Sequence, residues 1–211
     1  MLQLNHVTLS GNGKKILDDC TFQFKEGIPY VIVGEPDDFV IFFKAVCEEK
    51  KTDSGEIVTW DGAERFNACD DKFLPGDLTP MQYADGLLKL YKGEGFEPGV
   101  YLLEAGFDTS KKDRFIKDLD GKDKAALRFF AMKTIDIYVN VFGEPLPETG
   151  LLEDWVDKNK DDKVMIFGVS DEESAKLLKE KLGAEVIMYP ELVKGYAPGT
   201  LSLSKSTHQV P

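Results

Sequence analysis

The chain has 211 residues, of which 30% are charged and 42% hydrophobic, a composition typical of one globular domain. Its formal net charge of −12 disfavours nucleic acid and anionic lipid as partners, because both attract proteins mainly through Lys and Arg. No apolar run approaches the roughly 20 residues of a membrane-spanning helix, so we expect no direct membrane insertion.

The first third of the chain is predicted to be rich in β-structure, with one helix inserted. Alternating apolar and polar residues indicate strands, and the glycines of residues 11–15 indicate a hairpin turn. The predicted elements are, in order, strands at Leu2–Leu9, Ile16–Phe24 and Tyr30–Val33, an amphipathic helix at Phe39–Cys47, and a strand at Glu56–Trp60.

From Thr79 onward the apolar residues take the spacing of helices. Thr79 as N-cap and Pro80 as first helical residue predict a helix start. Further helical segments are predicted at Val100–Ala105, Lys111–Ile116 and Asp120–Lys133, followed by strands at Ile135–Phe142, Lys163–Val169 and Glu185–Tyr189 that alternate with helices at Leu151–Lys158 and Glu172–Leu182. This alternation predicts an α/β fold with a mainly parallel sheet.

We expect the whole chain, residues 1–211, to form a single domain. Residues 1–78 and 134–194 are predicted to form the sheet core and an N-terminal antiparallel β subdomain. Residues 79–133 are predicted to form a helical insertion. Residues 195–211 form a tail rich in Gly, Pro, Ser and Thr.

The segment after the third predicted strand has the layout of a phosphate-binding loop without its phosphate-binding residues. A working loop reads G-x-x-x-x-G-K-[ST], because its glycines expose backbone N–H groups and its Lys reaches the phosphate oxygens. The eight positions are filled by Gly34, Glu35, Pro36, Asp37, Asp38, Phe39, Val40 and Ile41. Phe39, Val40 and Ile41 thus stand where the second Gly, the Lys and the Ser/Thr belong.

The acidic residues of this loop disfavour ATP. A carboxylate about 4 Å from a phosphate oxygen costs on the order of 1 kcal/mol in water-like surroundings and about 4 kcal/mol near a protein surface. Glu35, Asp37 and Asp38 offer three such groups. We therefore expect neither useful ATP binding nor hydrolysis, and no ATP or Mg²⁺ cofactor.

These carboxylates have two other readings. Asp37 or Asp38 could act as the N-cap of the helix at Phe39, taking the N–H groups that a phosphate would have used. Alternatively, Glu35, Asp37, Asp38 and Glu144 could gather into a divalent-cation site, since hard cations take oxygen ligands. We favour capping, and we predict no metal site.

The order of the elements resembles the ATPase domain of ATP-binding cassette (ABC) transporters along nearly the whole chain. The resemblance is carried by the opening LQLNHVTLSGNGKKILDDCTFQFKEGIPYVIVG, by TDSGEIVTWDG (52–62), by FLPGDLTPMQYADGLLKLY (73–91), by residues 118–145 and by KVMIFGVSDEES (163–174). No single motif is specific, whereas their joint order and spacing are. The resemblance implies a P-loop NTPase-like core with a β subdomain and a helical insertion.

The same alignment indicates losses at each nucleotide-contacting motif. The family signature LSGGQ is replaced by Leu119, Asp120, Gly121, Lys122 and Asp123, which would put negative charge toward a partner's nucleotide. Gly143 stands at the magnesium-binding aspartate of the Walker B strand, and Glu144 keeps the general-base position. Ser170 replaces the switch histidine. The family's Q-loop glutamine aligns near Asp70 or Asp71. The aromatic residue that stacks on adenine in the family should lie near Ser10–Asn12, where no aromatic is present.

The resemblance therefore implies a degenerate ABC-type ATPase subunit, a cytoplasmic pseudoenzyme held at the membrane through its partners. The three cysteines are consistent with a reducing compartment. The implied partners are a second ABC ATPase subunit, a transmembrane permease, or both. In the family, the surface around Leu74–Tyr91 receives the membrane subunits.

Two alternatives remain open. The chain could be a weak or unconventional ABC-type ATPase that uses Glu144, or a stand-alone module that binds a cation in its acidic former pocket.

Overall fold

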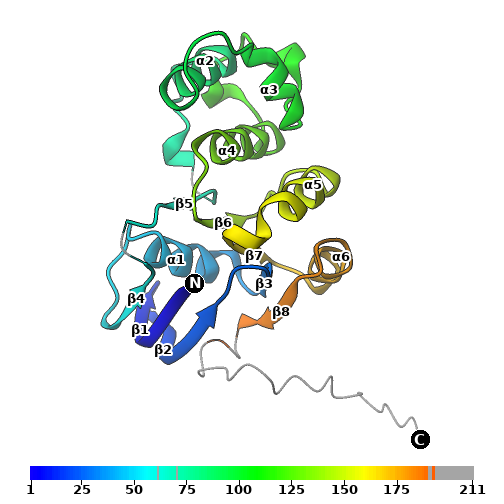
Figure 1. The fold of residues 1–211 in the computed structure, drawn as a ribbon. Coiled ribbons are helices and arrows are strands. Elements are labelled where there is room, and N and C mark those ends of the chain that lie inside the picture. The colour runs from blue at the N-terminus through cyan, green and yellow to red at the C-terminus, as the bar shows by residue number, and fades with distance from the viewer. Residues whose placement is uncertain (61, 70, 190–191, 193–211) are drawn as a thin grey trace, which may run out of the picture.

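The fold is that of a computed structural model, which describes residues 1–60, 62–69, 71–189 and 192. The predicted α/β architecture is confirmed: a parallel sheet forms the centre, an antiparallel sheet lies at one end and a group of helices at the other (Figure 1). The strands are β1 (Leu2–Gly11), β2 (Lys14–Phe24), β3 (Tyr30–Val33), β4 (Ser54–Val58), β5 (Arg65–Asn67), β6 (Val139–Gly143), β7 (Val164–Val169) and β8 (Glu185–Met188).

The helices follow the predicted alternation with the strands. They are α1 (Pro36–Val46), α2 (Pro80–Tyr91), α3 (Pro98–Glu104), α4 (Gly121–Ile135), α5 (Thr149–Asn159) and α6 (Glu172–Leu182). Thr79 caps α2 in a capping box, in which its side chain accepts from the Gln82 N–H and the Gln82 side chain accepts from the Thr79 N–H. This confirms the predicted helix start.

Five described strands form the parallel sheet, in the order β5-β6-β7-β3-β8. Every pairing in it is parallel, and β3 lies between β7 and β8. In such a sheet a ligand normally binds beyond the carboxyl ends of the strands. That edge is where β3 runs into α1 and where β6 and β7 end, so the candidate residues of three motifs meet there.

The second sheet pairs β1 with β2 and β4, in the order β2-β1-β4, and is antiparallel throughout. Helix α1 packs between this sheet and the parallel sheet, with contacts to β2, β6 and β7. The aromatic residues of α1 supply much of this layer, and the Phe24 and Phe42 ring centroids lie 6.2 Å apart. The amphipathic pattern that predicted the helix is thus explained by burial between two sheets.

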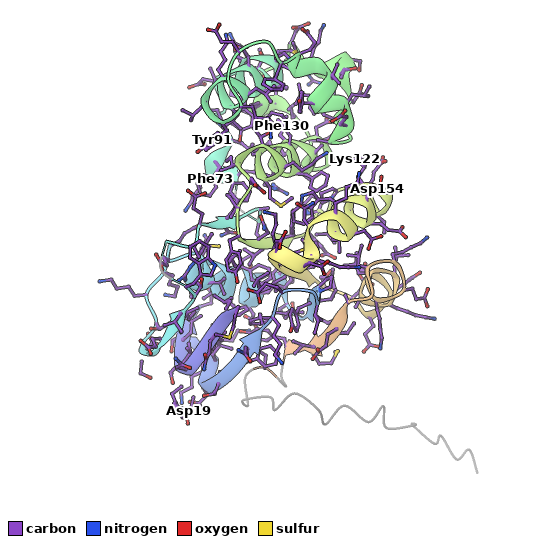
Figure 2. The ribbon with its side chains drawn as sticks, in the orientation of Figure 1. Asp19, Phe73, Tyr91, Lys122, Phe130 and Asp154 are labelled. Carbon is purple, nitrogen blue, oxygen red and sulfur yellow. The ribbon has the colours of Figure 1, made fainter. Side chains whose placement is uncertain are left out.

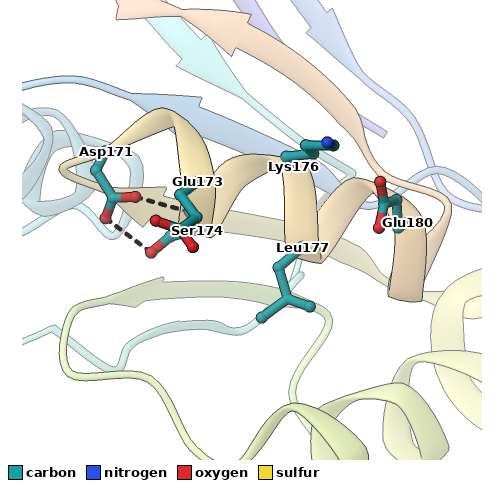
Figure 3. Close-up of a pocket in the computed structure, with 6 residues that line it drawn as sticks. All are labelled: Asp171, Glu173, Ser174, Lys176, Leu177 and Glu180. Carbon is teal, nitrogen blue, oxygen red and sulfur yellow. Dashed lines mark hydrogen bonds between the residues drawn. The ribbon is translucent and has the colours of Figure 1, made fainter.

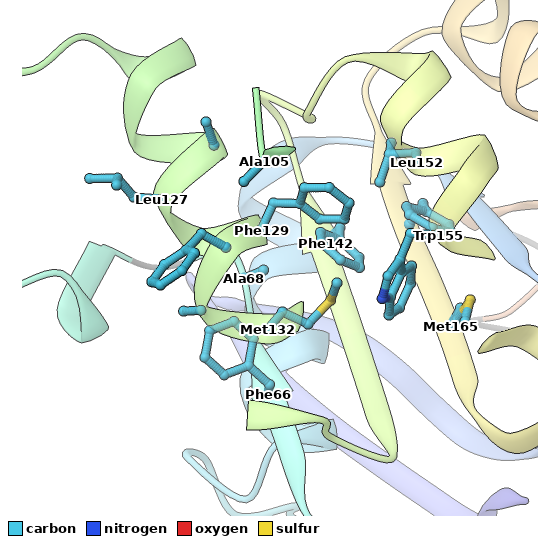
Figure 4. Close-up of a cluster of buried hydrophobic side chains, with 14 of the residues drawn as sticks. Phe66, Ala68, Ala105, Leu127, Phe129, Met132, Phe142, Leu152, Trp155 and Met165 are labelled. Atoms are coloured by element: carbon cyan, nitrogen blue, oxygen red, sulfur yellow. The ribbon is translucent and has the colours of Figure 1, made fainter. Parts of the chain in front are cut away.

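The other face of the parallel sheet is covered by α4, α5 and α6, and its core is aromatic (Figure 4). Phe142 of β6 stacks on Phe167 of β7 with ring centroids 5.1 Å apart. Phe129 of α4 and Trp155 of α5 meet edge-to-face at 6.1 Å. Such pairs add about 0.5–1.5 kcal/mol each beyond the apolar area that they bury. Through them, α4 is packed directly onto the strand that ends at Gly143.

Two boundary predictions were wrong for local backbone reasons. The strand predicted at Ile135–Phe142 begins only at Val139, because α4 continues through Ile135. Asp136 then ends the helix in the left-handed conformation, with φ 60°, a conformation that Asp tolerates better than most residues. The segment predicted as helix at Lys111–Ile116 is instead a non-helical connection between two short 3₁₀ turns, Thr109–Lys111 and Ile116–Asp118.

Strand β5 was not predicted, since three residues are too few to show a period. The division of the chain at residues 79 and 133 stays a prediction, and the tail at residues 195–211 lies outside the described residues. Within the part of the chain that the structure describes, no helix is long and apolar enough to cross a membrane.

Candidate functional site

The connection from β3 to α1 is a two-residue turn made by Gly34 and Glu35. The Gly34 N–H donates to the carbonyl of Val169 at 3.0 Å, and a Cβ at Gly34 would lie 2.6 Å from Tyr189 Cβ. Glycine is therefore required here by close packing. Helix α1 starts at once with Pro36, so no extended loop separates strand from helix.

The predicted capping by Asp37 or Asp38 is wrong. The N-cap is Glu35, whose side chain makes no capping hydrogen bond, and both aspartates lie inside the first turn. The helix begins three residues earlier than predicted because Pro36 occupies its first position. Two carboxylates in the first turn still interact favourably with the helix dipole, typically by about 0.3–1 kcal/mol each.

Asp38 is buried, with 7% of its surface exposed, and is paired with Lys14 at the start of β2. Lys14 Nζ lies 2.9 Å from Asp38 Oδ1, and this contact raises the pKa of the Lys14 ammonium. Together with Asn12, Glu35 and Asp37, the pair lines an open recess of about 500 Å³. Sequence reasoning missed Lys14, because its pairing with α1 depends on the hairpin lying over the helix.

Phe39 fills the space beside the strand ends. Its side chain is 1% exposed. A Cβ at Gly168 would lie 2.7 Å from Phe39 Cδ2, and one at Gly143 would lie 3.2 Å from Phe39 Cε2. Phe39, which the resemblance places at the second glycine of the loop, thus lies against Gly143, which it places at the magnesium-binding aspartate. An aspartate side chain at Gly143 would meet both the ring and Cys69 Sγ, which is 2.7 Å from the same Cβ position.

Glu144 and Ser170, which the resemblance places at the general-base and switch positions, are brought together. Ser170 Oγ donates to Glu144 Oε2 at 2.7 Å, and the Ser170 N–H donates to Glu144 Oε1 at 3.3 Å. Both residues are exposed at the ends of β6 and β7. The carboxylate therefore has two donors from its own chain. Glu144 is joined to Pro145 by a cis peptide bond.

After Ser170 the chain enters α6, whose N-terminus lies in a shallow acidic recess (Figure 3). Asp171 caps the helix: its carboxylate accepts from the Ser174 N–H at 2.8 Å and from Ser174 Oγ at 2.7 Å. These bonds lower the pKa of the Asp171 carboxyl. Both oxygens of the Asp171 carboxylate are thus engaged in capping α6.

The signature-like residues form the entry to α4. Asp120 is the N-cap, and its Oδ1 accepts from the Asp123 N–H at 3.0 Å. Lys111 Nζ bonds Asp120 Oδ2 at 3.1 Å and Asp123 Oδ2 at 2.5 Å. Lys111 therefore compensates part of the negative charge predicted here, and it is a second residue that sequence reasoning missed.

The other signature-like residues are anchored as well. Leu119 is buried in the helical core, and Lys122 pairs with Glu148 at 3.2 Å. A Cβ at Gly121 would lie 3.3 Å from the Pro145 ring. The start of α4 thus lies close to the segment that follows Glu144.

A buried arginine connects α4 with the Q-loop position. Arg128, 5% exposed, forms an ion pair with Asp71, which is half exposed. Its second NH group donates to the Pro145 carbonyl at 3.4 Å. Asp71 lies where the resemblance places the Q-loop glutamine, whereas the other candidate, Asp70, lies outside the described residues. Arg128 is the third residue that sequence reasoning missed.

The proposed cation site does not form. Glu144 is engaged by Ser170 and Asp38 by Lys14. Among the described residues, no group of three or more His, Cys, Asp or Glu side chains is placed to hold a metal ion.

No protein-family model matches the sequence, and no curated protein matches it. Solved structures do. The ATP-binding cassette MJ0796, a dimer in a post-hydrolysis state bound to ADP and Pi, matches with a TM-score of 0.67 and 15% identity over 89% of this chain and 94% of that chain.

Two further structures give the same result. A putative ABC transporter ATP-binding protein from Pyrococcus furiosus gives a TM-score of 0.65 at 13% identity, covering 93% and 99%. A nucleotide-free ATP-binding cassette from an ABC transporter gives 0.58 at 14% identity, covering 90% and 88%. The likeness at such low identity lies in the fold, and the chain therefore has the fold of an ATP-binding cassette.

Proposed function

We propose that this chain is an ABC cassette-like subunit that does not bind or hydrolyse ATP and acts as a structural or regulatory partner. Its partners are a membrane permease, an active ATPase subunit, or both. The observation that carries the proposal is the position of Phe39, whose buried ring packs against Gly143 and Gly168 at the strand ends. Phosphate and magnesium would need that space, together with a Lys and an Asp at the positions that Val40 and Gly143 occupy.

The electrostatics support the same conclusion. Glu35, Asp37 and Asp38 surround the start of α1, and Lys14 is the basic residue that shares their recess. Lys14 is paired with Asp38 rather than free to receive a phosphate. A carboxylate about 4 Å from a phosphate oxygen near a protein surface costs about 4 kcal/mol, and about 1.4 kcal/mol is a tenfold loss of affinity. Binding of a nucleotide at this edge is thus opposed by both shape and charge.

Among the described residues, no contact of Glu144 supports the alternative of weak hydrolysis. A general base must reach the water or hydroxyl that it activates. Both carboxylate oxygens of Glu144 accept hydrogen bonds from Ser170. Isothermal titration with ATP and Mg²⁺, alongside a phosphate-release assay, separates the two functions. We expect no saturable heat and no turnover, whereas micromolar binding would refute the proposal.

A groove between the helical region and the sheets suits a partner. It measures about 520 Å³, and its walls include Phe66 of β5, Phe73, and Tyr83, Leu87 and Tyr91 of α2. Two of these residues, Phe73 and Tyr91, which are labelled in Figure 2, are 41% and 48% exposed. Exposed apolar surface of this kind marks interaction sites. The groove lies at the surface where the family resemblance expects a permease.

A second cassette is the other proposed partner, since MJ0796 is described as dimeric. The start of α4, where Asp120 and Asp123 are already bound by Lys111, would face that partner. A helix N-terminus binds phosphate only while its N–H groups are free. The N–H of Asp123 is taken by Asp120, so we propose that this chain also contributes nothing to a shared nucleotide site.

A further inference from the structure

Helix α3 lies in the helical region, at the opposite end of the molecule from the antiparallel sheet (Figure 1), and carries apolar residues on two faces. Its inner face packs on α2 and α4, with Leu102 and the following Ala105 buried in the core. Its outer face presents Val100 and Leu103, which are 50% and 64% exposed. Because a surface helix normally turns polar residues outward, this composition indicates a face that is covered by a partner.

The start of α3 holds a further apolar side chain at the surface. Phe96 precedes the N-cap Glu97 and packs edge-to-face on Tyr101, with ring centroids 5.8 Å apart. This contact is a hydrophobic staple, which fixes the angle at which the chain enters the helix. Phe96 is still 39% exposed. The apolar groups at this surface therefore have a defined arrangement before any partner binds.

Two carboxylates accompany the apolar residues on the outer face. Glu97, Val100 and Glu104 follow the i, i+3, i+7 spacing of one helix face, and both glutamates are exposed. Among the described residues, neither glutamate takes part in an ion pair. Lys133 of α4 contacts this end of α3 through the backbone carbonyl of Glu104. The outer face thus combines exposed apolar surface with two carboxylates that no described cation neutralises.

We propose that the outer face of α3 is a docking site for an amphipathic helix of a protein partner. In that helix, basic residues at i and i+7 flank apolar residues at i+3 and i+4. A helix rises about 1.5 Å per residue, so this spacing sets the basic groups opposite Glu97 and Glu104 and the apolar ones over Val100 and Leu103. The face shares no residue with the groove lined by α2, so the proposal is independent of a permease in that groove.

Charge favours this occupant over two others. A second copy of the chain would use the same patch on both subunits in a two-fold contact, which brings like carboxylates together. An anionic lipid surface would be repelled by the same groups. The net charge of −12 opposes both of these occupants, whereas it attracts a basic partner.

The direct test is binding of a fluorescently labelled helical peptide to the full chain, followed by anisotropy. The peptide carries lysines at i and i+7 and leucines at i+3 and i+4. A comparison peptide of the same composition carries its lysines on the opposite face. We expect saturable binding of the first peptide that is at least about tenfold tighter, a difference of about 1.4 kcal/mol. Equal binding of the two peptides, or no binding, would overturn the proposal, because general attraction to an acidic chain does not depend on residue order.

Substitutions of exposed leucines test the apolar part of the face. Leu103→Gln should weaken peptide binding about fivefold or more, because less apolar surface is then covered. Leu177→Gln is the matched control, since Leu177 is an exposed leucine on α6. Both side chains are exposed, so both variants should unfold at the wild-type temperature. Val100→Gln serves as a second variant on the same face. Equal effects of Leu103→Gln and Leu177→Gln on binding would contradict the assignment.

Substitutions of carboxylates test the charged part. The double variant Glu97→Gln, Glu104→Gln should weaken binding and reduce its dependence on salt, because the two ion pairs are lost. The double variant Glu172→Gln, Glu173→Gln removes the same charge from exposed positions on α6 and should have little effect. Similar losses in the two double variants would show that the peptide responds only to the overall charge, and would overturn the proposal.

Sedimentation of the wild-type chain, alone and with phosphatidylserine vesicles, tests the other occupants. We expect neither self-association nor vesicle binding through this face. Self-association or vesicle binding that Leu103→Gln abolishes would assign the face to a second copy or to lipid, and would overturn the proposal.

Discussion

Phe39 and Gly143 are in direct contact across the edge of the sheet where a nucleotide site would lie. A Cβ added at Gly143 would lie 3.2 Å from Phe39 Cε2. In the alignment that the family resemblance implies, Phe39 stands where the phosphate loop has a glycine and Gly143 where magnesium is held by an aspartate. The two residues fit one another, so Phe39 fills this part of the edge, beside the ends of β6 and β7.

This packing predicts that restoring the aspartate will destabilise the protein. In Gly143→Asp the side chain would meet Phe39 and Cys69, and its charge would be buried without a partner. We expect a loss of about 3 kcal/mol or more in the free energy of unfolding, measured by urea denaturation. Gly150→Asp is the matched control, because nothing lies within 4 Å of its Cβ position. Equal stability of the two variants would contradict the contact.

Removing the ring should also be costly. Phe39→Ala leaves a cavity between α1 and the strand ends, and buried Phe→Ala substitutions typically lose about 3–5 kcal/mol. Val40→Ala is a milder control on the same helix, because Val40 packs only at the margin of that core. A loss below about 1 kcal/mol for Phe39→Ala, read from urea denaturation, would show that the ring does not fill this space in solution.

The pairing of Arg128 with Asp71 predicts different effects for two surface aspartates. Asp71→Asn leaves a buried guanidinium without its carboxylate, and we expect a loss of about 2–3 kcal/mol. Asp77→Asn is the control: Asp77 is 94% exposed and lies 3.4 Å from Lys117. A surface pair of this kind is worth about 0–1 kcal/mol. Similar losses in both variants would count against the Arg128 contact.

Asp120 predicts a pH dependence of stability. The Asp123 N–H and, after it, Lys111 lower the pKa of the Asp120 carboxyl below 3.8. Because the folded-state pKa is the lower one, the stabilisation is present above about 3.8, the value for the unfolded chain, and is lost as the pH falls through the folded-state pKa. Asp120→Asn keeps a capping side chain without titrating, so its unfolding temperature should change less steeply over this acidic range. Identical slopes would refute the interpretation.

The groove predicts a partner contact at Phe73. A charged residue there, as in Phe73→Glu, should abolish recovery of a permease on affinity purification from membranes. Phe115→Glu is the control, since Phe115 is 48% exposed but does not line the groove. Recovery of only a monomer with the wild-type chain would weaken the proposal of a permease partner.

The order of strands and helices could be predicted because their apolar periods are long enough to read. The bounds predicted for Glu172–Leu182 match α6 to the residue, and in the structure Asp171 caps its start and Gly183 its end. The start of α1 was missed although Pro36 is the usual signal for a first helical residue.

The site was less predictable. Positions such as Gly143 and Ser170 follow from the order of motifs, and their adjacency follows from a parallel sheet. The pairs Lys14–Asp38 and Arg128–Asp71 join residues far apart in the chain, and no local pattern indicates which lysine or arginine will meet which carboxylate.

The most direct test of the central claim is the thermal unfolding temperature of the wild-type chain with and without about 5 mM ATP and excess Mg²⁺. A ligand that binds the folded state alone stabilises it by about 2.7 kcal/mol when present at 100 times its Kd, so a site with a Kd of about 50 μM would be plainly visible. The closed edge around Phe39 predicts no nucleotide-dependent shift. A saturable rise in the unfolding temperature with ATP and Mg²⁺ would contradict it.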